Sequence, residues 1–145
     1  MSGQKGKKAL PEIEPTAYGD ALYKVLGNAA RGVYKLIARV EITGRENLPK
    51  NGGYIIVANH TTELDPVTVA FPAFVNGALP RFLAKDSLFR APVLGYIMRK
   101  LAHIPVVRGS VDARKSLITA RKVVEAGGAV VIFPEGTTTH DPQLW

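Results

Sequence analysis

The chain has 145 residues, a length that favours a single folded domain over two. Hydrophobic residues make up 46% and charged residues 21%, and these ordinary globular values exclude a disordered or low-complexity chain for most of its length. The formal net charge of +7 favours an anionic partner, such as a membrane surface, a phosphorylated substrate or nucleic acid. The sequence has no cysteine, which excludes disulfides, thiolate metal sites and a cysteine nucleophile.

The first forty residues combine a basic tail with an amphipathic segment. Residues 1–15 carry lysine, glycine and proline without periodicity and are expected to be disordered, and they lack the apolar core of a secretory signal. Residues 16–40 predict a helix, because their apolar positions fall within an arc of about 120° of the helical wheel. The cations on the opposite face are Lys24, Arg31, Lys35 and Arg39. Two interpretations remain open: the helix packs on its own domain, or it lies on an anionic membrane surface.

The rest of the chain alternates short apolar runs with helix signals. Four β-branched runs predict buried strands, and a weaker run near Val40–Thr43 predicts another. The four runs are Tyr54–Ala58, Arg81–Ala84, Ile104–Val107 and Ala129–Phe133. Strands that alternate with helices predict an α/β domain of three layers, with a largely parallel sheet flanked by helices.

Three helices are expected between these strands. Asp65 offers an N-cap residue, and the proline that follows it suits the first helical position. Residues 87–101 predict a helix that Pro92 interrupts. A third helix begins near Ser110, and the glycine pair at 127–128 ends it.

Ligands of open α/β sheets bind at the carboxyl ends of the strands. Here those ends carry a histidine, two cations and a carboxylate, which are His60, Lys85, Arg108 and Glu135. Each residue alone has a structural explanation, such as a solvated loop cation or a tight turn. Their convergence on one edge of the sheet predicts a binding site there.

The pair His60 and Asp65 adds a specific geometry to this edge. His60 leaves a strand and Asp65 begins the next helix, so a tight loop can turn the carboxylate back towards the imidazole. Such a carboxylate fixes the tautomer of the ring and supports the imidazolium. The alternative is that Asp65 only caps a helix and His60 only fills a loop. The sequence has no Gly-x-Ser-x-Gly elbow, so the pair is expected to act as a general base on a substrate hydroxyl.

Other motifs are missing from the sequence. It contains neither the phosphate-binding loop of nucleotide hydrolases nor the glycine fingerprint of dinucleotide-binding proteins. The histidines at 60, 103 and 140 do not have metal-ligand spacing, so no metal is expected. His103 lies at the edge of an apolar strand and is expected to be structural.

Four sequence blocks together resemble the glycerolipid acyltransferases, of the 1-acyl-glycerol-3-phosphate (lysophosphatidic acid) acyltransferase type. The blocks are Asn59–Asp65, Phe82–Lys85, Ile104–Gly109 and Phe133–Thr137, in an order and spacing that fit the family. The likeness covers roughly residues 40–145. It implies transfer of a fatty acyl group from a coenzyme A or carrier-protein thioester to the free hydroxyl of 1-acyl-glycerol-3-phosphate, in phospholipid biosynthesis.

The resemblance also implies roles for single residues. His60 would take the hydroxyl proton and Asp65 would orient it, while backbone N–H groups near the His60 loop would stabilise the oxyanion. No cofactor is implied, because the thioester co-substrate is already activated. The residues implied in substrate binding are Lys85, Arg108, Glu135, Gly136 and Thr137. Of these, the two cations would hold the phosphate of the acceptor.

The partners implied are a lysophospholipid acceptor, an acyl thioester donor and an anionic membrane surface, without nucleic acid. No run of about 18 apolar residues is present to span a bilayer, so attachment is expected to be peripheral, at the cytoplasmic face of the membrane. The helix at 16–40 is the expected attachment point.

Two departures from the family pattern bear on the acceptor and on the extent of the domain. Thr138 stands where many members have an arginine, and Thr62 stands where serine is usual. The family has a further, proline-bearing block that is expected after residue 145. Residues 41–145 are therefore expected to be the N-terminal part of a catalytic domain that continues.

Two rival interpretations stay open at this stage. A basic module that binds membranes or nucleic acid would explain the charge and the helix, but it leaves the cluster at the strand ends unexplained. A thioester hydrolase would use His60 to activate water in place of a lipid hydroxyl.

Overall fold

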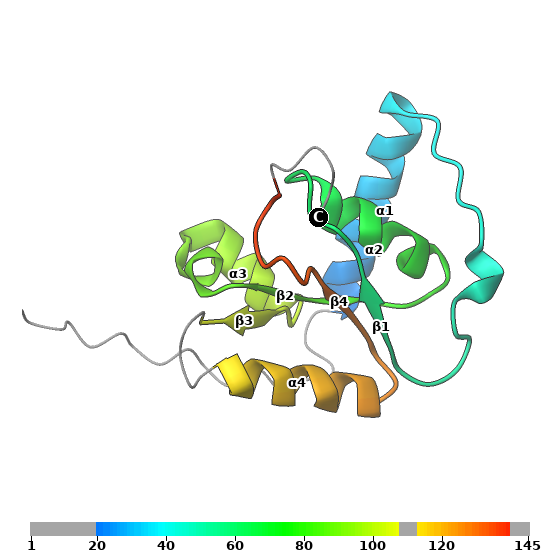
Figure 1. The fold of residues 1–145 in the computed structure, drawn as a ribbon. Coiled ribbons are helices and arrows are strands. Elements are labelled where there is room, and N and C mark those ends of the chain that lie inside the picture. Colours follow the sequence, from blue (N-terminus) through cyan, green and yellow to red (C-terminus); the bar gives the residue numbers. More distant parts are fainter. Residues whose placement is uncertain (1–19, 108–112, 140–145) are drawn as a thin grey trace, which may run out of the picture.

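The structure is a computed structural model, and it describes residues 20–107 and 113–139. Four strands and four α-helices alternate along most of the chain (Figure 1). They are α1 (Asp20–Ile37), β1 (Tyr54–Val57), α2 (Asp65–Val75), β2 (Arg81–Lys85), α3 (Pro92–Lys100), β3 (Ile104–Val106), α4 (Ala113–Glu125) and β4 (Ala129–Ile132). Two short 3-10 helices are η1 (Arg45–Asn47) and η2 (Asp86–Arg90). The predicted α/β class is confirmed.

The sheet is entirely parallel, with strand order β1-β4-β2-β3. The connections through α2 and α3 run across the sheet in one direction, and the connection through α4 returns. Right-handed crossovers therefore place α2 and α3 on one face and α4 on the other, as Figure 1 shows. The carboxyl ends of all four strands meet at one edge, where a ligand site is expected.

The core cluster lies between the sheet and α4. Val130 and Val131 of β4 are fully buried, and Val130 packs with Ile104 of the edge strand β3. The helix α4 covers this face through Ala120 and Val123. The apolar β-branched runs of the sequence form strands because both faces of the sheet are covered by helices.

The helix α1 packs on α2 through only part of its circumference. The ring of Tyr23 stacks on Phe74 with centroids 6.2 Å apart, and the ring of Tyr34 lies 5.5 Å from Phe71. Between these contacts Gly27 allows close approach, because a Cβ there would lie 2.4 Å from the Phe74 ring. The contact face of α1 is therefore made of two tyrosines and small residues.

Most of the predicted apolar arc of α1 remains exposed. The exposed large side chains on this helix are Val25, Leu26, Val33, Leu36 and Ile37. On the helical wheel the contact face is centred about 110° from the middle of the apolar arc, so the two stripes are neighbours, and packing on α2 leaves most of the arc exposed. The helix does pack on its own domain, but it does so without burying its apolar stripe.

The strand predicted near Val40–Thr43 is wrong. These residues have no regular secondary structure, and η1 follows them. Val40 and Ile42 instead lie beside Phe71 and Val75 on the outer side of α2. Gly44 then takes a left-handed conformation with φ of 74°, which ends any extended run.

The other strands and the helices α2 and α3 match the prediction within one or two residues, whereas α1 ends at Ile37, three residues before the predicted end. The interrupted helix over 87–101 is η2 followed by α3, and Pro92 is the first residue of α3. The helix α4 ends before Gly127, whose φ is 87°. The predicted basic tail at 1–15 and the helix start near Ser110 lie outside the described residues. Within the described part of the chain, no helix is long and apolar enough to cross a membrane.

Candidate active site

The loop between β1 and α2 brings His60 and Asp65 together. The ladder of β1 and β4 continues to Ala58, whose N–H donates to Ile132, and His60 follows two residues later. The Nδ1 atom of His60 lies 3.1 Å from Oδ2 of Asp65. Each side chain is 17% exposed, so the pair is largely shielded from water.

The loop also supplies hydrogen bonds that hold Asp65 as a carboxylate. The N–H of Thr62 donates to Oδ2 at 2.8 Å, and its hydroxyl donates to Oδ1 at 2.8 Å. The N–H of Thr61 donates to Oδ2 as well. These bonds, with the backbone of Thr62 contributing most, hold the pKa of Asp65 far below its usual range, although partial burial opposes the shift.

The charge of Asp65 decides the tautomer of His60. A carboxylate only accepts hydrogen bonds, so Nδ1 of the neutral ring carries the hydrogen. Nε2 of His60 then has a free lone pair and can act as a base. His60 is also one of the residues that line the large pocket described below.

The expectation that Asp65 is the N-cap residue of its helix is wrong. The N-cap position of α2 is Leu64, and Asp65 is the first helical residue. Its oxygens accept from His60, Thr61 and Thr62, which precede the helix. The carboxylate is therefore directed back to the loop and to the imidazole, as predicted for a His60–Asp65 pair, and it does not cap the helix.

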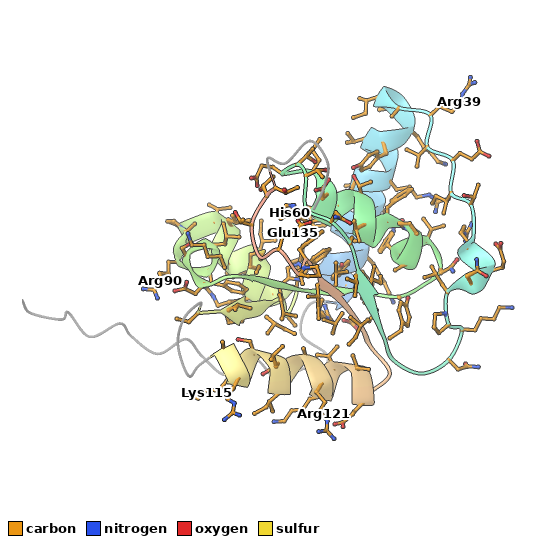
Figure 2. The ribbon with its side chains drawn as sticks, in the orientation of Figure 1. Arg39, His60, Arg90, Lys115, Arg121 and Glu135 are labelled. Carbon is orange, nitrogen blue, oxygen red and sulfur yellow. The ribbon has the colours of Figure 1, made fainter. Side chains whose placement is uncertain are left out.

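Residues after β4 hold the backbone of His60 from the other side. Oε2 of Glu135 accepts from the N–H of His60 at 2.9 Å, and Oε1 accepts from the side chain of Asn59 at 3.0 Å. The N–H of Thr139 donates to the carbonyl of His60 at 2.6 Å. Figure 2 shows His60 and Glu135 side by side at the carboxyl edge of the sheet. We call these three bonds the His60 clamp.

The imidazole plane is fixed by aromatic packing. The ring of Phe133 stacks on His60, with centroids 4.5 Å apart and planes 25° apart. Phe82 of β2 stacks on the far side of Phe133 at 6.3 Å. The ring of His60 is thus held by a carboxylate at one edge and an aromatic face below it, which restricts its rotation.

A pocket of about 670 Å³ opens beside His60. Its walls come from α1, α2, β2, η2 and α3, and most of the side chains are apolar. The apolar side chains of the helices that line it include Leu26, Val67, Phe71, Phe74, Leu94 and Met98. A pocket of this size and character suits a long hydrocarbon chain.

Polar groups are concentrated near one end of this pocket. Lys85, the last residue of β2, is exposed and lines it, as does Glu63. Gly136 and Thr137 follow from the loop after β4. Gly136 has φ of 68°, a conformation that favours glycine and lets the backbone turn tightly at the pocket.

Beneath the pocket lies a buried polar group of the core. Nδ1 of His103 accepts from the N–H of Phe82 at 3.2 Å, and the ring contacts Tyr23 and Phe82 edge to face. Burial, aided by the nearby charge of Arg81, lowers the pKa of His103 to about 3. His103 is therefore neutral and structural, as expected.

The structure places five of the seven predicted site residues around one end of the pocket. His60, Lys85, Gly136 and Thr137 line it, and Asp65 lies behind His60. Glu135 is not among the described residues that line the pocket, and it instead accepts a hydrogen bond from the N–H of His60. Arg108 lies outside the described residues. What the sequence interpretation missed is the wall that α1 contributes and the stacking of Phe133 on His60.

Comparisons with known proteins agree with this geometry. A family model described as Acyltransferase matches residues 39–145. The chain belongs to the acyltransferase family, and the resemblance seen in the sequence is confirmed at that level. No solved structure matches the chain with significance.

Several curated relatives carry a more specific name. A 1-acyl-sn-glycerol-3-phosphate acyltransferase of Bacillus subtilis is 31% identical over 123 residues, which are 83% of this chain and 59% of the relative. Its namesake in Borreliella burgdorferi is 36% identical over 104 residues, which are 68% of this chain and 39% of the relative. An uncharacterized protein of Mycobacterium leprae is 32% identical over 111 residues, 73% of this chain and 28% of the relative. The chain thus spans at most about three fifths of the length of these relatives.

Proposed function

We propose that this chain carries the catalytic centre of an O-acyltransferase that moves a fatty acyl group from a thioester to the free hydroxyl of 1-acyl-glycerol-3-phosphate, a step of phospholipid biosynthesis. The observation that carries the proposal is the His60–Asp65 pair, 3.1 Å apart, beside a large apolar pocket. Names of relatives from two bacteria support the choice of acceptor.

In the proposed reaction Nε2 of His60 takes the proton of the acceptor hydroxyl while its oxygen attacks the thioester carbonyl. The new C–O bond gives a tetrahedral oxyanion, and its collapse breaks the C–S bond. The leaving thiolate takes the proton back from the imidazolium, so the enzyme is restored. Asp65 stabilises the imidazolium in between, and a thioester needs no further activation, so no cofactor is required.

The pocket supplies a place for an acyl chain in this scheme. Its apolar lining would shield hydrocarbon from water, and each buried methylene group is worth about 0.8 kcal/mol. His60 lines the pocket, so we propose that an occupant chain places its carbonyl carbon near Nε2. The donor is proposed to be an acyl group on coenzyme A or on a carrier protein.

The phosphate of the acceptor is proposed to contact Lys85 and Arg108. Lys85 stands at the polar end of the pocket, and no ion pair of its side chain is seen within residues 20–107 and 113–139. Arg108 comes two residues after the end of β3 in the sequence, and β3 pairs with β2. Gly136 and Thr137 would shape the site for the glycerol portion.

We also propose peripheral attachment to the cytoplasmic face of an anionic membrane through α1. The support is the exposed apolar arc, in which Leu36 is 87% and Ile37 is 74% exposed. An interfacial helix of this kind binds through buried apolar area and through attraction between its cations and anionic lipids. The net charge of +7 agrees with such a surface.

The direct test is acyl transfer by the chain from a long-chain acyl thioester in the presence and absence of 1-acyl-glycerol-3-phosphate. We expect thiol release to depend on the acceptor and to match the formation of the diacyl product. Thiol release at the same rate without acceptor, yielding free fatty acid, would instead identify a thioester hydrolase. If a folded protein that binds vesicles shows neither activity, the result would favour a membrane-binding module without catalysis.

A further inference from the structure

A second apolar surface lies on the opposite side of the pocket from α1. Val93 and Tyr96 of α3 are 73% and 54% exposed, and Leu88 of η2 and Leu94 of α3 are also exposed. We call these four residues the α3 surface. On the helical wheel Val93 lies between Leu94 and Tyr96, and Leu88 comes from the turn before the helix, so the α3 surface extends from the outer face of α3 to the side that lines the pocket.

The inner side of α3 is already occupied, so the helix cannot rotate to bury this patch. Gly95 packs on the backbone of Phe89, where an added Cβ would lie 2.2 Å from the carbonyl oxygen. The guanidinium of Arg99 donates to that same carbonyl. Both contacts fix α3 on η2 with Val93 and Tyr96 outward.

The charge around the α3 surface is strongly positive. Between residues 85 and 100 there are four cations and one carboxylate, Asp86, which pairs with Arg90. Arg99 is directed to the carbonyl of Phe89, while Lys85 and Lys100 are exposed. Nζ of Lys100 lies 5.7 Å from the ring centroid of Tyr96, which leaves an apolar ring with a cation above it. A tyrosine beside lysines is typical of the interface between lipid tails and headgroups, and it complements an anionic lipid surface.

The α3 surface is continuous with the pocket. Leu88 and Leu94 are partly exposed and also line the pocket, while Leu26 of α1 lines it from the other wall. Figure 1 shows α1 and α3 on opposite sides of the carboxyl edge of the sheet. One flat surface that touches both helices would therefore cover the pocket between them.

We propose that the α3 surface is a second site of contact with an anionic lipid bilayer, which together with α1 holds the pocket against the membrane. The proposal rests on the proposed function in one respect, since it gives a lipid substrate a path into the pocket that avoids water. Attachment at two points also fixes the orientation of the molecule, which one helix alone does not.

The chain has no cysteine, so a single introduced cysteine reports on one position. Val93→Cys carries an environment-sensitive fluorophore on the α3 surface. Leu117→Cys is the matched control, because Leu117 is 58% exposed on α4 at the other face of the sheet. Figure 2 marks that face by Lys115 and Arg121.

With vesicles of phosphatidylcholine and phosphatidylglycerol we expect a blue shift of the fluorophore at position 93 and none at 117. With phosphatidylcholine alone the shift at 93 should be much smaller. An unshifted fluorophore at 93 on vesicle-bound protein, or equal shifts at both positions, would overturn the proposal. A shift caused by an acidic carrier protein in solution, and absent with vesicles, would assign the surface to a protein partner and overturn it as well.

A second variant tests binding without a probe. Val93→Asp should weaken sedimentation with anionic vesicles about fivefold, while Leu117→Asp should leave it unchanged. A water-soluble, short-chain acceptor separates this proposal from the proposed function. If the protein transfers acyl groups to that acceptor and Val93→Asp does not change vesicle binding, the α3 surface is not a docking site but the proposed enzyme activity stands. If the probe at position 93 shifts but no acceptor is acylated, the docking site stands and the proposed activity is wrong.

Discussion

The chemistry at the scale of single residues depends on which nitrogen of His60 faces Asp65. Nδ1 faces the carboxylate, and the loop N–H groups keep that carboxylate ionised. The structure therefore assigns the hydrogen to Nδ1 and the lone pair to Nε2. Asp65 stays a carboxylate throughout the neutral pH range, so it does not compete with Nε2 for a proton.

The substitution Asp65→Asn tests this assignment. Oδ2 of Asp65 accepts from Thr61, Thr62 and His60, so the amide oxygen of the asparagine would take that position and still accept from Nδ1, but without the charge that stabilises the imidazolium. We expect the rate of acyl transfer to fall by about 10²-fold or more with the fold retained. Asp86→Asn, which removes a surface ion pair with Arg90, is the control and should keep its rate. A rate for Asp65→Asn within about twofold of the original would contradict the assigned role of this residue.

Glu135 acts on His60 through the backbone. Its two oxygens accept from Asn59 and from the N–H of His60, so its charge is directed to the loop that carries the base. The sequence resemblance implies that Glu135 shapes the acceptor site, and the structure indicates how it would do so, by setting the position of His60. We treat Glu135 as a positioning residue of the His60 clamp.

Both partners of Glu135 are N–H donors, so the amide nitrogen in Glu135→Gln would face a donor and one hydrogen bond of the His60 clamp would be lost. We expect kcat to fall about tenfold while KM for the acceptor changes little, because the base moves but the acceptor keeps its contacts. Glu125→Gln on α4 is the control for removing a surface charge. A rise in KM at constant kcat would show that Glu135 contacts the acceptor itself.

At the scale of elements, α1 has two separate stripes. One stripe contacts α2 through Tyr23, Gly27 and Tyr34, and the other leaves Leu36 and Ile37 in solvent. A helix that exposes its apolar stripe while packing through tyrosines and small residues has a free surface for a second partner. That surface is the main support for membrane attachment.

The double variant Leu36→Ser/Ile37→Ser should weaken sedimentation with anionic vesicles about tenfold or more, because it removes two large apolar side chains from the exposed stripe. The matched control is Leu117→Ser/Ile118→Ser on α4, where the side chains are 58% and 56% exposed. Melting temperatures measured alongside should be unchanged in both variants. Equal loss of vesicle binding in the two double variants would show that α1 is only a packing element.

The elements differ in how well the sequence predicts them. The four strands were predictable, because runs such as Ala129–Ile132 are buried on both faces and so are continuously apolar. The segment that α1 packs against was not predictable, since helical periodicity reveals an apolar stripe but not what covers it. Its contact face uses Gly27 and Ala30, whose small size carries no hydrophobic signal.

The same contrast holds for the candidate site. The topology rule for parallel strands correctly predicts that His60, Lys85 and Glu135 leave one edge of the sheet. The pocket wall from α1 depends on tertiary packing between segments far apart in sequence, so no local pattern predicts it. The stacking of Phe133 on His60 joins positions that are 73 residues apart, so it also depends on tertiary packing that no local pattern predicts.

For the whole molecule, stability depends on keeping His103 neutral. Its pKa is about 3 in the folded chain, against about 6.5 when unfolded. The unfolded chain therefore binds a proton between these values and the folded chain does not, so the free energy of unfolding falls as pH drops below 6.5. The expected loss is about 2 kcal/mol between pH 7.5 and pH 5.

His103→Asn isolates this contribution, because its amide oxygen can still accept from the N–H of Phe82. Urea unfolding at pH 7.5 and pH 5 should show a smaller pH dependence in the variant than in the original chain. Asp65 does not interfere in this window, since its stabilising effect is lost only as pH falls below the ordinary range of a carboxyl group. The same loss of stability in both proteins would show that another group titrates.

The proposed mechanism depends on His60 removing the proton from a lipid hydroxyl. The most direct measurement is the single-turnover rate of diacyl product formation from a long-chain acyl thioester and 1-acyl-glycerol-3-phosphate, compared between the original chain and His60→Ala. We expect a fall of at least about 10²-fold in His60→Ala, with unchanged melting temperature and unchanged vesicle binding. Product formation by folded His60→Ala at near the original rate would contradict it.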